Sequence, residues 1–156
     1  GLTNEIPDFN LFDNNNSIYT RARMLPPAKI SRTTLEKTII AEGCIINASR
    51  IENSVIGIRT RIGTGTTIVS SYLMGIDFYE TIEEIEHDKS HGLPSVGIGS
   101  RCYIRNAIVD KNCRMGDDVR INGGAHLENT DHSLYTVKDG IIVIKKGAVL
   151  PNGFVI

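Results

Sequence analysis

The stretch SVIGIRTRIGTGTTI, residues 54–68, decides the fold. It places Ile56, Ile62 and Ile68 six residues apart, and a glycine follows each of the first two. This period fits neither an α-helix, which repeats every 3.6 residues, nor a hairpin strand, which alternates every two. An aliphatic residue at every sixth position is instead typical of a chain built from stacked repeats.

The same spacing recurs later in the chain, together with its irregularity. A first series advances by six, five, six and six residues through Ile45, Ile51, Ile56, Ile62 and Ile68. A second series makes the same steps 53 residues later through Ile98, Ile104, Val109, Met115 and Ile121. Asn53 falls onto Asn106 and Gly63 onto Gly116. The last residues keep the six-residue step at Ile144, Leu150 and Ile156.

These hexads predict an all-β fold, a single-stranded left-handed parallel β-helix. Each hexad supplies one short strand and one corner, and about three hexads make a coil. Successive coils stack at the ordinary strand spacing of about 4.8 Å, with the aliphatic residues pointing into a narrow axial core. Gly and Asn suit the corners because they take positive φ at low cost. The residues alone leave the hand of the coil open, and the left-handed assignment follows the hexapeptide coils already known.

Three segments interrupt the repeats. Residues 1–32 lack hexads, so we expect a linker that packs on the β-helix and a β-helix domain in residues 33–156. Residues from about 76 to 95 predict a helical insertion, because Thr81 and Glu84 fit a capping box and Gly92 and Pro94 end it. Residues 124–140 predict a loop with a hairpin edge.

The composition excludes several functional classes. The net charge of −1 does not indicate a nucleic-acid partner, and no apolar run is long enough for a membrane span. Cys44, Cys102 and Cys113 lack metal-site spacing, so we predict buried, reduced thiols in a cytoplasmic protein. Gly1 does not resemble a natural start, so we expect a fragment.

Four histidines are candidates for chemistry. His87 and His91 lie four residues apart on the expected helix and would form half of a metal site. No third ligand is evident, so a solvated helix face is favoured and no metal is predicted. His126 and His132 lie in the loop after the second series, where either could be the general base of a hexapeptide acyltransferase that binds acyl-CoA between coils. The alternative is that both are polar loop residues.

The basic residues suggest an anion site. Lys111 and Lys146 fall at coil corners, and corners of neighbouring coils stack, so these side chains are expected to approach each other. Arg21 and Arg23 precede the first coil. Two or three fixed cations in a shallow groove bind phosphate, whereas the alternative is a set of solvated surface side chains.

Four ordered stretches resemble one family. They are PDFNLFD with SIYTRARMLPPAKI, then SVIGIRTRIGTGTTIVSSYLMGIDFYET, VGIGSRCYIRNAIVDKNCRMG and DGIIVIKKGAVLPNGFVI. Together they resemble the C-terminal β-helix domain of glucose-1-phosphate adenylyltransferase, also called ADP-glucose pyrophosphorylase. That family makes ADP-glucose and pyrophosphate from ATP and glucose 1-phosphate for glycogen or starch synthesis. It is tetrameric and is regulated by phosphorylated effectors.

The resemblance also implies roles for particular residues. Lys111 and Lys146 match effector-binding lysines, Arg23 matches an anion-contacting linker arginine, and Asp77 matches an aspartate near that pocket. Arg21 stands where the family commonly has glutamine, which leaves the effector's identity open. The family's catalytic nucleotidyltransferase domain, with its Mg²⁺ site, is N-terminal and has no counterpart here. The resemblance therefore implies a non-catalytic domain without a cofactor, and it leaves a regulatory paralogue possible.

Overall fold

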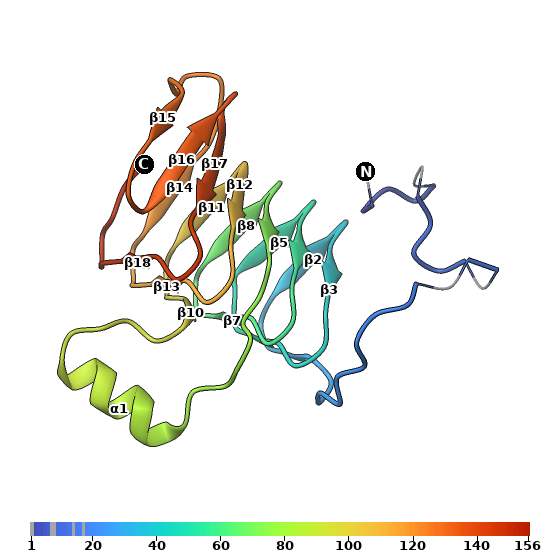
Figure 1. Ribbon diagram of the computed structural model, residues 1–156, viewed down its shortest axis with the longest axis horizontal. Coiled ribbons are helices and arrows are strands. Elements are labelled where there is room, and N and C mark those ends of the chain that lie inside the picture. The colour runs from blue at the N-terminus through green and yellow to red at the C-terminus, as the bar shows by residue number, and fades with distance from the viewer. Residues whose placement is uncertain (1, 7–8, 14, 17) are drawn as a thin grey trace.

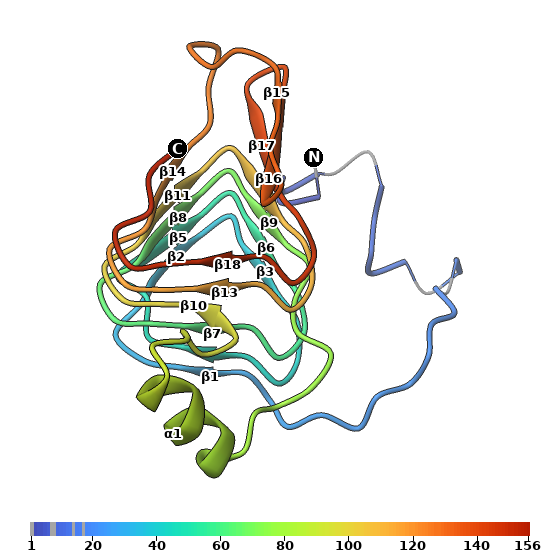
Figure 2. The same cartoon turned by 60° about the vertical axis from the view of Figure 1, so that its left-hand side comes forward.

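The computed structural model describes residues 2–6, 9–13, 15–16 and 18–156. Within this part of the chain, short strands wind into a three-sided β-helix (Figures 1 and 2). Sheet A contains, in spatial order, β1 (Lys29–Ile30), β4 (Ile45–Ile46), β7 (Arg61–Ile62), β10 (Gly97–Ile98), β13 (Arg114–Met115) and β18 (Val149–Leu150). Sheet B contains β2 (Thr34–Glu36), β5 (Arg50–Glu52), β8 (Thr67–Val69), β11 (Tyr103–Arg105) and β14 (Arg120–Asn122). Sheet C contains β3 (Ile39–Ile40), β6 (Val55–Ile56), β9 (Tyr72–Leu73), β12 (Ala107–Val109), β17 (Ile141–Ile144), β16 (Tyr135–Lys138) and β15 (Thr130–Asp131).

The core consists of three stacked columns of aliphatic side chains, one from each sheet. In sheet B, for example, Ile51 pairs with Ile68, Ile68 with Ile104, and Ile104 with Ile121, and all four are fully buried. Each buried side chain therefore packs against the equivalent residue of the coils above and below. The predicted hexads are confirmed at these positions and throughout the second series.

The hexad prediction is wrong at Ile45. The inward residue of β4 is Ile46, which is fully buried and pairs in register with Ile62. Ile45 is half-buried, faces outward and pairs with Arg61. Since side chains alternate along a strand, only one of two adjacent isoleucines can enter the core. Strand pairing decides between them, and the step from Ile46 to Ile51 is five residues rather than six.

The corners are made by residues with positive φ. Asn53 and Asn106, which the internal repeat aligns, have φ of 46° and 47° at the same corner, between sheets B and C. The side-chain amide of Asn106 donates a hydrogen bond of 2.9 Å to the carbonyl of Gly123 in the next coil. The three cysteines are free and buried, as predicted, and each thiol donates to a carbonyl at a corner.

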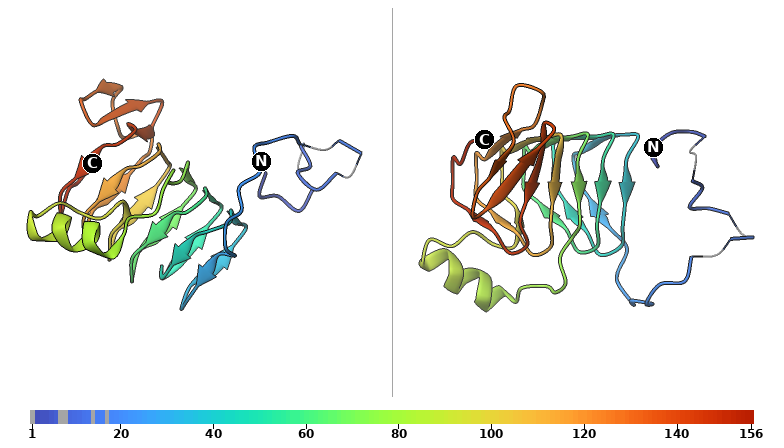
Figure 3. Two further views of the ribbon diagram at one scale, coloured as in Figure 1. Left: turned by 60° about the horizontal axis from the view of Figure 1, so that its bottom comes forward. Right: turned by 45° about the horizontal axis from the view of Figure 1, so that its top comes forward.

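The predicted helical insertion is confirmed as α1 (Ile82–Ser90), between β9 and β10. Thr81 and Glu84 form the reciprocal capping box. The insertion lies beside sheet A (Figures 1 and 3) and is fastened to it by Arg114. One nitrogen of that guanidinium lies 2.9 Å from carboxylate oxygens of both Glu80 and Asp88. No helix among the described residues is long and apolar enough to cross a membrane.

The two ends of the chain differ in how they join the coils. Near the C-terminus, β15, β16 and β17 pair antiparallel, which confirms the expected hairpin edge. Near the N-terminus, β1 already pairs with β4, so the first coil begins at Lys29 rather than at the expected boundary of 33. Residues 18–24 are exposed, and the linker extends from the coil stack (Figure 3). Its described residues contact the coils through the 2.8 Å bond from the Gly43 amide to the Pro26 carbonyl and through a 2.8 Å bond from the Thr3 hydroxyl to the Asn53 side-chain oxygen.

Candidate functional site

The corner between sheets C and A, termed here the C–A corner, is the candidate anion site. At this corner, one backbone hydrogen bond joins each coil to the next, and the part of each coil that takes part is called a rung below. The donors and acceptors are Gly43 to Pro26, Arg59 to Glu42, Ile76 to Ile58, Asn112 to Gly75, and Gly147 to Lys111. Lys111 and Lys146 therefore lie on adjacent rungs, about 4.8 Å apart along the coil axis.

Asp77 is bound directly to this corner. Its carboxylate accepts a 2.7 Å hydrogen bond from the Lys111 ammonium and a 3.1 Å bond from the Asn112 side-chain amide. The Asp77 amide donates back to the Asn112 side-chain oxygen at 2.9 Å. The hydrogen bond from Lys111 holds the pKa of Asp77 below its usual value, and the charge of Lys146 acts in the same direction. Lys111, Lys146 and Asp77 therefore form one electrostatic group.

Arg59 is a further cation of this corner, one that the sequence patterns above did not predict. Its guanidinium carbon lies 5.6 Å from the centre of the Tyr79 ring, and one nitrogen donates to the Ile76 carbonyl at 3.4 Å. A signal was present in the sequence, because the 53-residue repeat aligns Arg59 with Asn112. Both residues have positive φ, of 57° and 60°, and so occupy the same corner position.

The structure does not bring Arg21 and Arg23 to the lysines. Both residues are exposed, and within the described chain neither side chain has a hydrogen bond or an ion pair. The linker joins the rungs of the C–A corner at Pro26, which lies five coil steps from Gly147. Five steps correspond to about 24 Å along the axis. The anion-binding roles of Arg21 and Arg23 stay predictions.

The histidines lie elsewhere. The rings of His87 and His91 are 4.4 Å apart between centroids, but the described residues contain no group of three or more His, Cys, Asp or Glu arranged for a metal. His132 is exposed and stacks on Tyr135 at 4.8 Å. One of its ring nitrogens accepts the Leu134 amide at 3.2 Å. His126 is exposed in the same loop.

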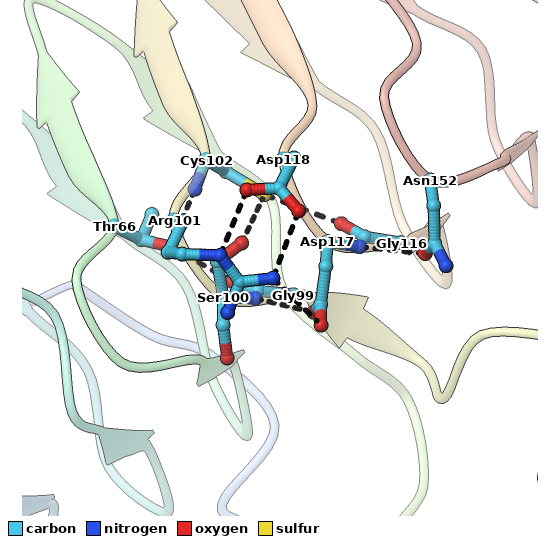
Figure 4. A network of polar contacts seen from close by, with 9 residues as sticks. All are labelled: Thr66, Gly99, Ser100, Arg101, Cys102, Gly116, Asp117, Asp118 and Asn152. Carbon is cyan, nitrogen blue, oxygen red and sulfur yellow. Dashed lines mark hydrogen bonds and ion pairs between the residues drawn. The ribbon is translucent and has the colours of Figure 1, made fainter.

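The corner between sheets A and B shows how a charged corner is neutralised internally (Figure 4). Arg101 makes two 2.8 Å hydrogen bonds to the carboxylate of Asp118. Asp117 accepts the Ser100 amide at 2.8 Å, and its own amide donates to Asn152 at 2.8 Å. These groups satisfy one another across three coils. At the C–A corner, by contrast, Asp77 is the hydrogen-bonded counter-ion of Lys111, and Lys146 lies beside that pair.

The parallel pairing of the coil strands in all three sheets and the hydrogen bonds between coils at the corners define the chain as a parallel β-helix of hexapeptide type. A family model described as the GLGC left-handed parallel beta-helix domain matches residues 23–155. The chain belongs to this family, and its coil is left-handed. The family resemblance is thereby confirmed over residues 23–155, since this is the C-terminal domain of ADP-glucose pyrophosphorylase-like proteins. The stretch PDFNLFD precedes the matched range, and its first two residues lie outside the part of the chain that the structure describes, so its resemblance stays a prediction.

Proposed function

We propose that the chain is the regulatory and oligomerisation domain of a cytoplasmic glucose-1-phosphate adenylyltransferase. The observation that carries the proposal is the pair of lysines, Lys111 and Lys146, on adjacent rungs of the C–A corner. In this proposal, catalysis and Mg²⁺ binding belong to an N-terminal nucleotidyltransferase domain, and this domain regulates that activity without catalysing the reaction.

A phosphorylated effector is the ligand that suits this corner. Two lysines whose backbones lie on rungs about 4.8 Å apart can direct both flexible side chains to the oxygens of one phosphate. The Asn112 amide adds a neutral donor beside them. If the effector binds one arrangement of the two domains better than another, it shifts the population toward that arrangement. A coupling of about 1–3 kcal/mol changes affinity or activity about 5- to 150-fold.

The outward face of sheet C carries an apolar strip that suits contact with another protein domain. Ile39, Val55, Tyr72, Ile108 and Val143 stand in register across five strands of this face. Tyr72 is 43% exposed. A continuous apolar strip of this kind marks an interaction surface. We assign it to the enzyme's own catalytic domain, and we assign the unpaired strand edges at the coil ends to contacts within a homotetramer.

The test is an activation curve of the two-domain enzyme. Lys111→Ala removes one of the two adjacent ammonium groups, so half-maximal activation should need about 5- to 50-fold more effector. Lys138→Ala is the matched control, because Lys138 is an exposed lysine of the hairpin. An activation curve that Lys111→Ala leaves unchanged would remove the lysine pair from the regulatory site.

A second candidate is a free-standing hexapeptide acyltransferase. A cavity of about 420 Å³ lies between the B–C corner and the hairpin segment, next to the loop that carries His126 and His132. Such an enzyme would bind acyl-CoA between its coils. Titration of the chain with acetyl-CoA distinguishes the two functions, since saturable binding that His132→Ala or His126→Ala weakens favours the acyltransferase.

A further inference from the structure

The residues that open the insertion form a strap along the C–A corner. At one end, Asp77 is hydrogen-bonded to Lys111 and Asn112. At the other end, the Tyr79 hydroxyl donates a 2.8 Å hydrogen bond to the carbonyl of Gly43. Residues 77–79, called the strap below, therefore connect the proposed anion site to a rung near the start of the coil stack.

The reach of the strap agrees with the coil spacing. Gly43 lies three coil steps from Asn112, which corresponds to about 14 Å. Two extended residues cover about 7 Å of this distance, and the tyrosine side chain covers the rest. Arg59 lies between the two ends, and its guanidinium stacks on the Tyr79 ring. The strap therefore follows the line of cations.

The far end of the strap lies where the linker joins the coils. The Gly43 amide donates to the Pro26 carbonyl. A β-carbon on Gly43 would overlap the Tyr79 hydroxyl and would be in van der Waals contact with the Leu25 side chain, at 3.5 Å. The same residue thus anchors the linker through its amide and the strap through its carbonyl. The strap and the linker therefore meet at Gly43.

The near end of the strap is held weakly enough to be exchanged. The Asp77 and Lys111 side chains are 41% and 32% exposed, and exposed ion pairs contribute little net stability. The helix that follows the strap buries none of its residues. The rest of the insertion is fixed separately, because Arg114 pairs with Glu80, whose side chain is 2% exposed. The strap can move while the helix stays on sheet A.

We propose that the strap is an internal competitor for the anion site and couples that site to the linker. An anion that binds Lys111 and Asn112 takes the donors that Asp77 uses, releases its carboxylate and loosens the Tyr79 anchor at Gly43. The inference rests on the proposed function, because it requires an anion at Lys111. It adds that the site is autoinhibited by its own aspartate and that its output is the linker attachment.

The test is amide hydrogen exchange of the 156-residue chain, resolved by NMR, with inorganic phosphate as the probe and chloride at matched ionic strength as the reference. Saturating phosphate should accelerate exchange of the Asp77 and Gly43 amides by about 2- to 10-fold, the effect of losing one exposed hydrogen bond. Asp77→Asn should give similar acceleration without phosphate and should bind phosphate several-fold more tightly. Tyr79→Phe should bind phosphate like the wild type, while its Gly43 amide exchanges fast and no longer responds.

The outcomes separate the strap from the site. Saturable, Lys111-dependent phosphate binding with unchanged exchange at Asp77 and Gly43 would overturn the strap and leave the anion site standing. If neither the wild type nor Asp77→Asn binds phosphate saturably, both the proposed anion site and its competition with Asp77 are overturned. Lys138→Ala controls for general effects of phosphate, and a response lost in that variant would contradict the assignment to the corner.

Discussion

Replacing each of two adjacent isoleucines tests the core register. Ile46 is fully buried and stacked between Ile30 and Ile62, whereas Ile45 is half-buried on the outer face of the same strand. Ile46→Ala removes three carbons from the core, a loss of about 2.4 kcal/mol at about 0.8 kcal/mol each. The cavity left in the column raises the total to about 3–4 kcal/mol.

Ile45→Ala should cost about 1 kcal/mol or less, because the outer position keeps much of its solvent contact. For a chain of this length, the Ile46 variant should lower Tm by about 6–15 °C and the Ile45 variant by a few degrees. Circular dichroism during thermal and urea unfolding measures both. Equal losses of stability, or a larger loss for Ile45→Ala, would contradict the strand pairing, which places the Ile46 side chain in the core and the Ile45 side chain outside it.

Three further predictions follow from polar contacts. The pKa of Asp77 is depressed, so its contact with the C–A corner should persist at neutral pH and be lost only as the pH falls below the normal aspartate range. The loss should be observed as faster hydrogen exchange of the Asp77 amide, and Asp77→Asn should abolish this pH dependence. Burial raises the pKa of Cys113 to about 11, so iodoacetamide at pH 8 should label this thiol only after unfolding. Cys113→Thr should keep the free energy of unfolding within about 1 kcal/mol, because Thr60 already makes the equivalent corner hydrogen bond, to the Gly57 carbonyl at 2.7 Å. Arg114→Met should lower the free energy of unfolding by about 3 kcal/mol by leaving the buried Glu80 carboxylate unpaired, and adding Glu80→Met should restore most of that loss in urea unfolding.

The core could be predicted because each coil repeats the same physical requirement. An aliphatic residue must enter the narrow axis once per sheet, so the order of Ile51, Ile56, Ile62 and Ile68 is visible in the letters alone. The failure at Ile45 is informative for the same reason. Two adjacent aliphatic residues satisfy the spacing equally well, and only the hydrogen-bonded register with the next coil distinguishes them.

The candidate site was predictable only where it follows the repeat. Stacking of equivalent corners places Lys111 and Lys146 on adjacent rungs, and the 53-residue alignment would have added Arg59. Asp77 came from the family resemblance alone, because the repeat stops there and periodicity does not constrain where a departing chain goes. The reach of Tyr79 back to Gly43 is likewise a tertiary contact between residues 36 apart, with no local signal.

The three corners of the β-helix differ in their charged groups and in the segments that leave the coils there. This difference explains why regulation would be located at only one of them. The A–B corner is closed by Arg101 and its two aspartates. The B–C corner turns through positive-φ residues of which only Lys37 is charged, the others being Asn53, Ser70 and Asn106. The C–A corner is where the linker enters at Pro26 and the helical insertion leaves at Asp77, whereas the hairpin segment leaves the coils between β14 of sheet B and β17 of sheet C. A ligand at the C–A corner can exchange a contact with the departing strap without disturbing the core, whereas a ligand at the A–B corner would have to compete with the hydrogen bonds that join Arg101 to Asp118 in the next coil.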